Sequence, residues 1–138
     1  HQSGATQIDA LRANYEAAGV QADCTPFIED TATAFADADI IVCRAGASTV
    51  TEIAAVGAAA IFVPFPSAVD DHQTTNAQFL VDAGGGWLVQ QRDLTPEGLS
   101  QMLLKLERPA LVDIALKAKN MQKINATREV VTACEELA

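Results

Sequence analysis

Two short runs of consecutive apolar residues constrain the fold of this chain most strongly. Residues 39–43 (DIIVC) and 60–63 (AIFV) do not alternate with polar residues, which is expected of strands covered on both faces. A loop of small residues or prolines follows each run, and an Ala-rich stretch with helical spacing comes next. Strands that alternate with helices form a parallel sheet with helices on its faces. The sequence therefore predicts an α/β fold.

Local signals divide the rest of the chain into further elements. Asp30 is a candidate N-cap for the helix predicted at 31–36, and Gly57 closes the next one. Thr95-Pro96 has the form of an N-cap followed by proline at the first helical position. The predicted helices span 5–18, 31–36, 49–56, 72–83, 96–106, 110–121 and 126–137, with an extended run at 23–28 and a short strand at 87–89.

Composition excludes several classes of protein. The chain has 138 residues, about one domain, and 9 basic against 18 acidic residues give a net charge of −9. This balance argues against a nucleic-acid partner, which requires clustered basic residues. No run approaches the roughly 20 apolar residues of a membrane span. The three cysteines are far apart in the sequence, which argues against a disulfide framework and a zinc site. Two histidines are too few for another metal site.

In a parallel α/β sheet, ligands bind beyond the carboxyl ends of the strands. This rule selects the loops at 25–30, 44–52 and 64–73. In the second loop, Gly46 and Ala47 let a ligand approach the backbone, and the first amides of the following helix form an anion site suited to a phosphate. Thr49 and Glu52 also fit a capping box, which would satisfy the same amides internally. Arg44 is a candidate partner for an acidic neighbour.

The third loop places polar side chains at the start of the next helix. Asp70 or Asp71 is a candidate cap, and His72 and Gln73 then lie in the first turn, where both suit sugar hydroxyls. His72 has the chemistry of a general base, but no nucleophile lies near it in the sequence, which favours a binding or structural role. Asn76 is expected to bond the loop backbone.

Two longer stretches give the strongest signal. CRAGASTVTEIAAVG at 43–57 and FVPFPSAVDDHQTTNA at 62–77 closely resemble the C-terminal half of the MurG family of peptidoglycan glycosyltransferases, which convert lipid I to lipid II. HQSG at 1–4, TPFIED at 25–30 and ADIIVCR at 38–44 match as well. The resemblance implies a Rossmann-like parallel sheet, namely the C-terminal domain of a two-domain GT-B enzyme that binds UDP-N-acetylglucosamine.

The resemblance also implies roles for individual residues. Ile28 would meet the uracil edge through its backbone, and Thr31 would lie close to the base. Glu52 would accept hydrogen bonds from both ribose hydroxyls, which reverses the capping preference. Backbone amides would contact the diphosphate, and two side chains would contact N-acetylglucosamine hydroxyls. The amides belong to Ala47, Ser48 and Thr49, and the side chains to His72 and Gln73. The family often has Gln where this chain has His72, and Ser48 stands where relatives carry an apolar residue.

The same resemblance indicates a partial domain over 1–138. The family's N-terminal acceptor domain, with its glycine-rich motif, proposed base and membrane surface, has no counterpart in this sequence. Its first strand and G-G-S-x-G-A loop also precede the matched region, and the first residue is His rather than Met. We therefore expect no catalytic residue, metal or cofactor in this chain, and an open sheet edge able to pair with another chain.

The implied setting is the bacterial cytoplasm, on the cytoplasmic face of the inner membrane, with lipid I bound by the N-terminal domain. Two alternatives remain open from the sequence. One is another GT-B sugar-nucleotide enzyme, and the other is a non-catalytic UDP-sugar-binding module.

Overall fold

The computed structural model describes residues 1–67 and 69–137. Contacts divide the chain into two compact units, His1–Ala34 and Phe35–Ala138, and each unit is described by itself. Among the described helices, none is long and apolar enough to cross a membrane.

The first unit contains one helix and an irregular segment that folds back beside the N-terminus. Helix α1 (Ile8–Ala17) begins three residues later than predicted, and Gly19, with φ +66°, follows its end. The predicted extended run at 23–28 makes only an isolated parallel bridge, between Gln2 and Thr25. The His1 ring packs edge-on against Tyr15, 5.9 Å away between ring centroids.

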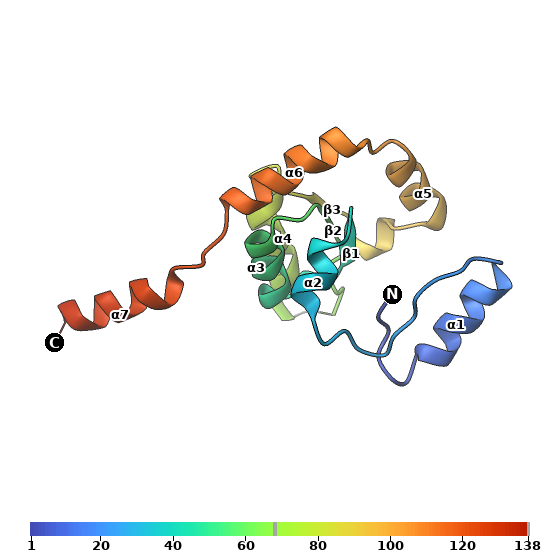
Figure 1. Ribbon diagram of the computed structural model, residues 1–138, viewed down its shortest axis with the longest axis horizontal. Coiled ribbons are helices and arrows are strands. Elements are labelled where there is room, and N and C mark those ends of the chain that lie inside the picture. Colours follow the sequence, from blue (N-terminus) through green and yellow to red (C-terminus); the bar gives the residue numbers. More distant parts are fainter. Residues whose placement is uncertain (68, 138) are drawn as a thin grey trace. The chain divides into compact units, whose positions relative to one another are not determined.

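The second unit contains the predicted parallel sheet. Strands β1 (Ile41–Cys43), β2 (Ala60–Phe62) and β3 (Trp87–Leu88) pair in the order β1-β2-β3, and both pairings are parallel (Figure 1). Val42 lies opposite Ile61 in this register. The α/β prediction and the parallel pairing of the two apolar runs are confirmed.

The remaining elements are helices joined by short connections. They are α2 (Thr31–Ala36), α3 (Ala47–Val56), α4 (His72–Val81), α5 (Pro96–Leu104), α6 (Arg108–Asn120) and α7 (Ala126–Glu136), with short 3₁₀ turns η1 (Val69–Asp71) and η2 (Gln91–Asp93). The predicted caps at three of their ends are confirmed. Asp30 Oδ1 accepts from the Thr33 amide at 2.9 Å, Thr95 Oγ1 accepts from the Gly98 amide at 3.0 Å, and Gly57 ends α3 in the left-handed region.

The core of the second unit lies between the sheet and helices α3, α4 and α6. Ala60 and Phe62 of β2 point to the same side of the sheet, and Ile53, Leu80 and Ala118 of the three helices pack in the same buried cluster. All five are fully buried. Glycine permits a close approach of α6, because a Cβ at Gly85 would lie 2.8 Å from the Ala118 Cα.

Replacing Phe62 by alanine tests this core. Phe62 is completely buried, so Phe62→Ala should lower the free energy of unfolding by about 3–5 kcal/mol, through lost burial and the cavity left behind. Phe79 of α4 is 39% exposed, and Phe79→Ala is the matched control with a much smaller loss. Urea unfolding measures both. Equal losses in the two variants would contradict the assigned core.

Candidate functional site

The loops that follow β1 and β2 lie at the same edge of the sheet, because the two strands are parallel. The first loop leads from Cys43 into α3, and the second leads from Phe62 into α4. The helices that these loops enter, α3 and α4, carry six of the eight residues predicted to bind a ligand, namely Ala47, Ser48, Thr49, Glu52, His72 and Gln73. The carboxyl edge of the sheet is therefore the candidate site in the second unit.

The N-terminus of α3 presents backbone amides without a side-chain cap. Its N-cap is Gly46, which has φ −61° and ψ 148° and no side chain to bond the first amides. The helix begins at Ala47 rather than at the predicted Thr49. Ala47 and Ser48 are exposed. The first-turn amides together with the helix dipole form an anion-binding geometry.

The capping alternative for Glu52 is wrong. Since α3 starts at Ala47, Thr49 is its third residue and Glu52 its sixth, so the two cannot form a capping box at this helix start. Glu52 is exposed, and its carboxylate makes no hydrogen bond or ion pair with any residue that the structure describes. The carboxylate is therefore available to a ligand, and its predicted contact with ribose stays a prediction.

Arg44 contacts carbonyl groups and an aromatic ring instead of the predicted acidic neighbour. Its Nη1 donates to the carbonyl oxygens of Val63 and Pro64, at 3.1 Å each. The guanidinium also lies 5.5 Å from the centre of the Phe65 ring. Arg44 therefore connects the loop after β1 to the loop after β2. This role could not be predicted from the sequence, because a backbone carbonyl leaves no signature there.

Two side chains of α4 bond the backbone of the same loops. Gln73 Oε1 accepts from the amides of Ala45, at 3.2 Å, and Phe65, at 3.0 Å. Asn76 Nδ2 donates to the Ala45 carbonyl at 3.1 Å, which confirms the prediction that Asn76 bonds the loop backbone. Gln73 was predicted only as a sugar contact, and its bonds to the loops are an additional finding.

The segment before α4 differs from the predicted cap. Asp70 and Asp71 both have positive φ, 53° and 51°, a conformation that aspartate tolerates better than most residues. Asp71 stands at the N-cap position, but it accepts from the Thr74 hydroxyl at 2.6 Å rather than from a backbone amide. His72 follows as the first residue of α4 and is exposed.

The other two predicted residues, Ile28 and Thr31, belong to the first unit. The Ile28 amide donates to Gln2 Oε1 at 2.9 Å. The backbone group of Ile28 that could still bond a uracil base is therefore its carbonyl. Thr31 is the first residue of α2 and is half-buried. The neighbouring Asp30 accepts from both the amide and the hydroxyl of Thr33, and these hydrogen bonds hold the pKa of its carboxyl below the usual value.

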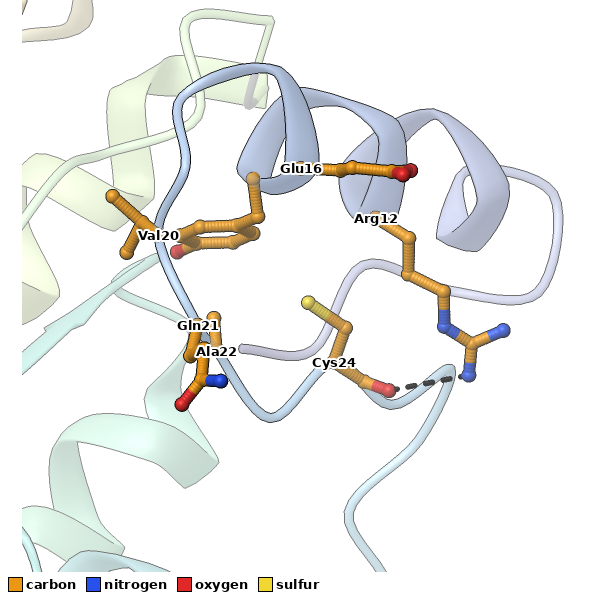
Figure 2. Close-up of a pocket in the computed structure, with 7 residues that line it drawn as sticks. Arg12, Glu16, Val20, Gln21, Ala22 and Cys24 are labelled. Carbon is orange, nitrogen blue, oxygen red and sulfur yellow. Dashed lines mark hydrogen bonds between the residues drawn. The ribbon is translucent and has the colours of Figure 1, made fainter.

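The first unit also has a shallow pocket that contains none of the predicted residues. Its volume is about 340 Å³, and it is lined by Arg12, Tyr15, Glu16, Val20, Gln21, Ala22 and Cys24. Figure 2 shows Arg12 reaching the Cys24 carbonyl, 3.4 Å away. These positions match no motif recognised in the sequence.

Metal ligands and the Cys43 thiol are the remaining groups with possible chemistry. The described residues contain no group of three or more His, Cys, Asp or Glu side chains that could hold a metal ion. Burial raises the pKa of the Cys43 thiol, at the end of β1, to about 12. Cys43 is therefore a neutral thiol at physiological pH and not a nucleophile.

The parallel sheet, the glycine-capped helix after its first strand and the cross-bonded loops at its carboxyl edge define an α/β domain of the Rossmann type. The model of the family described as the glycosyltransferase family 28 C-terminal domain matches residues 1–134. The chain belongs to this family.

Relatives of known name agree with the family assignment. The chain is 78% identical over 137 residues to the UDP-N-acetylglucosamine–N-acetylmuramyl-(pentapeptide) pyrophosphoryl-undecaprenol N-acetylglucosamine transferase of Paracidovorax citrulli, covering 99% of this chain and 39% of that protein. The transferase of the same name from Polaromonas naphthalenivorans is 78% identical over 138 residues, covering 100% of this chain and 38% of that protein. The chain thus spans about two fifths of the length of these curated relatives.

A solved structure agrees as well. The crystal structure of Acinetobacter baumannii MurG superimposes with a TM-score of 0.92 at 47% identity, covering 99% of this chain and 42% of that one. The fold expected from the family resemblance, the C-terminal GT-B domain, is confirmed.

The Asp30 cap generates a prediction about pH. The Asp30 pKa is lowered from its usual 3.8 in the folded chain. Its contribution to stability is therefore complete above pH 3.8 and is lost as the pH falls through the lower, folded-state pKa. An NMR titration of the Asp30 carboxyl should give a pKa below 3.8. An Asp30 pKa at or above 3.8 would contradict the cap.

Proposed function

We propose that the chain is the donor-binding part of a glycosyltransferase that transfers N-acetylglucosamine from UDP-N-acetylglucosamine to lipid I, forming lipid II. The names of its relatives supply the substrates. One geometric observation carries the proposal for this chain. The glycine-capped N-terminus of α3 and the Glu52 carboxylate, which no described residue bonds, lie on one helix, and Ser48 and Glu52, four residues apart, share a face.

That spacing suits a nucleoside diphosphate. One helical turn rises about 5.4 Å, which is the scale of the separation between a ribose and its attached phosphates. The amides of Ala47, Ser48 and Thr49 would donate to the diphosphate, and Glu52 would accept from the ribose hydroxyls. Ile28 and Thr31 would contact the uracil, and His72 and Gln73 the N-acetylglucosamine hydroxyls.

The same helix would act on the reaction. A hydroxyl of the lipid I sugar attacks the anomeric carbon and gives up its proton to a base, the bond from that carbon to the diphosphate oxygen breaks, and UDP leaves. The configuration at the anomeric carbon is inverted. Negative charge grows on the diphosphate as this bond breaks, and the α3 dipole and amides stabilise it. We assign no catalytic base to this chain. Because the acceptor is linked to a lipid, we place the reaction at the cytoplasmic face of the bacterial inner membrane.

Calorimetric titration of the chain tests the proposal. We expect UDP-N-acetylglucosamine to bind more tightly than UDP-glucose, because the sugar contacts discriminate between the two donors. Equal affinities would favour another GT-B sugar-nucleotide enzyme. No binding of either donor would overturn the assignment for this chain.

Substitution of Glu52 tests the ribose contact. Charge-assisted hydrogen bonds contribute roughly 1.5–3 kcal/mol, so Glu52→Ala should weaken UDP binding at least about tenfold, which corresponds to roughly 1.4 kcal/mol. Glu52→Gln keeps the shape and some hydrogen bonding and should cost less. The melting temperature should hardly change, because the side chain is exposed and has no partner among the described residues.

Glu135→Ala, an exposed position on α7, is the matched control. It removes the same charge and should leave UDP affinity unchanged. UDP affinity that is the same in Glu52→Ala as in wild type would require the ribose assignment to be dropped.

We further propose that the outer edge of β1 can pair with a second copy of the chain. Strand β1 is at one end of the three-stranded order. Ile41 and Cys43 direct their backbone groups to the β2 side, so those of Val42, between them, face the outer edge. The Val42 side chain is 46% exposed. An open edge with an apolar side chain favours pairing between chains.

Sedimentation at increasing concentration measures this pairing. The wild-type chain should self-associate, and Val42→Lys should shift it toward monomer, because a charged side chain on an edge strand disfavours pairing. Val130 of α7 is 63% exposed. Val130→Lys makes the same substitution away from the sheet edge and is the matched control. A wild-type chain that stays monomeric at all concentrations would contradict the proposal.

A further inference from the structure

Ala45 is held by two side chains of the same helix. This fully buried residue lies two positions beyond β1, where the strand pairing has ended and its backbone groups need other partners. Gln73 accepts its N–H at 3.2 Å, and Asn76 donates to its carbonyl at 3.1 Å. Both side chains come from α4 and are three residues apart, so they share a face of the helix.

The chemistry of the partners fixes the orientation of both amide side chains. Gln73 faces two N–H groups, those of Ala45 and Phe65, and only an oxygen can accept from both. Asn76 faces a carbonyl, which requires its NH₂ group. The Gln73 Nε2 group therefore faces away from these two amides, and no described residue accepts from it.

A third side chain reinforces the connection between the two loops. Arg44 donates to the carbonyls of Val63 and Pro64, so Arg44 and Gln73 both join the segment before α3 to the segment after β2. Hydrogen bonds from a charged donor to buried carbonyls are stronger than neutral ones. The two loops are thereby fixed relative to each other.

Ala45 lies directly before the N-cap of α3. The next residue is Gly46, the N-cap, which has no side chain to hold the helix start. A Cβ at Gly46 would lie 3.8 Å from Thr49 Oγ1. Within α3, the Thr51 hydroxyl donates to the Ala47 carbonyl at 2.8 Å. Among the described residues outside α3, the side chains that bond Ala45 act nearest to the first amides of the helix.

We propose that Gln73 and Asn76 are positioning residues for the diphosphate site. They hold Ala45 and, through it, keep the amides of residues 47–49 in the geometry that accepts a diphosphate. Gln73 has a second task, which is to contact the sugar of the donor. Since its oxygen already accepts from two loop amides, it can do so only as an N–H donor through Nε2. The inference rests on the proposed function and adds to it the residues that preorganise the anion site.

Four variants separate the two tasks of Gln73 and isolate Asn76. Gln73→Leu removes the acceptor and the donor, whereas Gln73→Glu keeps an acceptor for the loop amides and removes the donor. Asn76→Leu removes only the donor to Ala45. Gln78→Leu makes the same chemical change at an exposed position on α4, where the side chain bonds Asp82, and serves as the control.

Two measurements read these variants. Calorimetry gives the affinities for UDP and for UDP-N-acetylglucosamine, and NMR hydrogen exchange gives the protection of the Ala45 and Phe65 amides. Asn76→Leu and Gln73→Leu should weaken UDP binding by about fivefold to tenfold, the scale of one lost hydrogen bond. Gln73→Leu should also expose both amides to exchange.

Gln73→Glu should keep both amides protected and lower the preference for UDP-N-acetylglucosamine over UDP by at least about fivefold, again one hydrogen bond. The control should match wild type in both measurements. UDP affinity unchanged in Asn76→Leu and Gln73→Leu, with the fold intact by circular dichroism, would overturn the positioning role.

Failure of the proposed function has a different signature. A wild-type chain that binds no UDP would overturn the assignment of the ligand, and the positioning role with it. The Ala45 amide would still show whether the loops are held, because its exchange does not depend on a ligand. If the Ala45 amide of the wild-type chain exchanged as fast as that of an unstructured peptide, the proposal that Gln73 and Asn76 hold Ala45 would be overturned.

Discussion

The parallel pairing of β1 and β2 is the constraint on which the rest of the second unit depends. It places the carboxyl ends of both strands at one edge, so the loop that enters α3 and the loop that enters α4 become neighbours. The buried cluster around Phe62 and Ile53 holds the helices against the sheet. Antiparallel pairing would put these loops at opposite ends, and Arg44 could not reach the Val63 carbonyl.

The candidate site combines a backbone feature with side chains that hold it. The amides at the start of α3 supply donors for an anion, and their position follows from the bonds of Gln73 and Asn76 to Ala45. Glu52, on the same helix, adds a carboxylate that no described residue engages. Preorganised donors of this kind lose little free energy to reorganisation when charge develops on a ligand.

Local signals in the sequence predicted most of the fold. The two apolar runs predicted β1 and β2, and Asp30, Gly57 and Thr95 marked helix ends, because each acts on residues within one helical turn. The start of α3 was placed two residues late, since Thr49 and Glu52 match a capping box while Gly46 leaves no comparable signal.

The contacts across the site were harder to predict than its location. The rule that ligands bind beyond the carboxyl ends of parallel strands selected the loops after β1 and β2, which the structure brings to one edge of the sheet. The bonds of Arg44 and Gln73 join them to backbone groups up to 28 residues away, and any residue type can supply such groups. The pattern of side chains in the sequence therefore indicates which residues could bind a ligand. It does not indicate which of them hold the two loops together.

The backbone character of the α3 amides bears on how this site can change. A substitution at Ala47 or Ser48 alters a side chain that is exposed, but it leaves the N–H in place unless the new residue is proline. Under the proposed function, an inhibitor that draws its affinity from these amides would meet few single substitutions able to remove its contacts. An inhibitor that relied on the Glu52 carboxylate or the His72 ring could lose that contact through a single substitution.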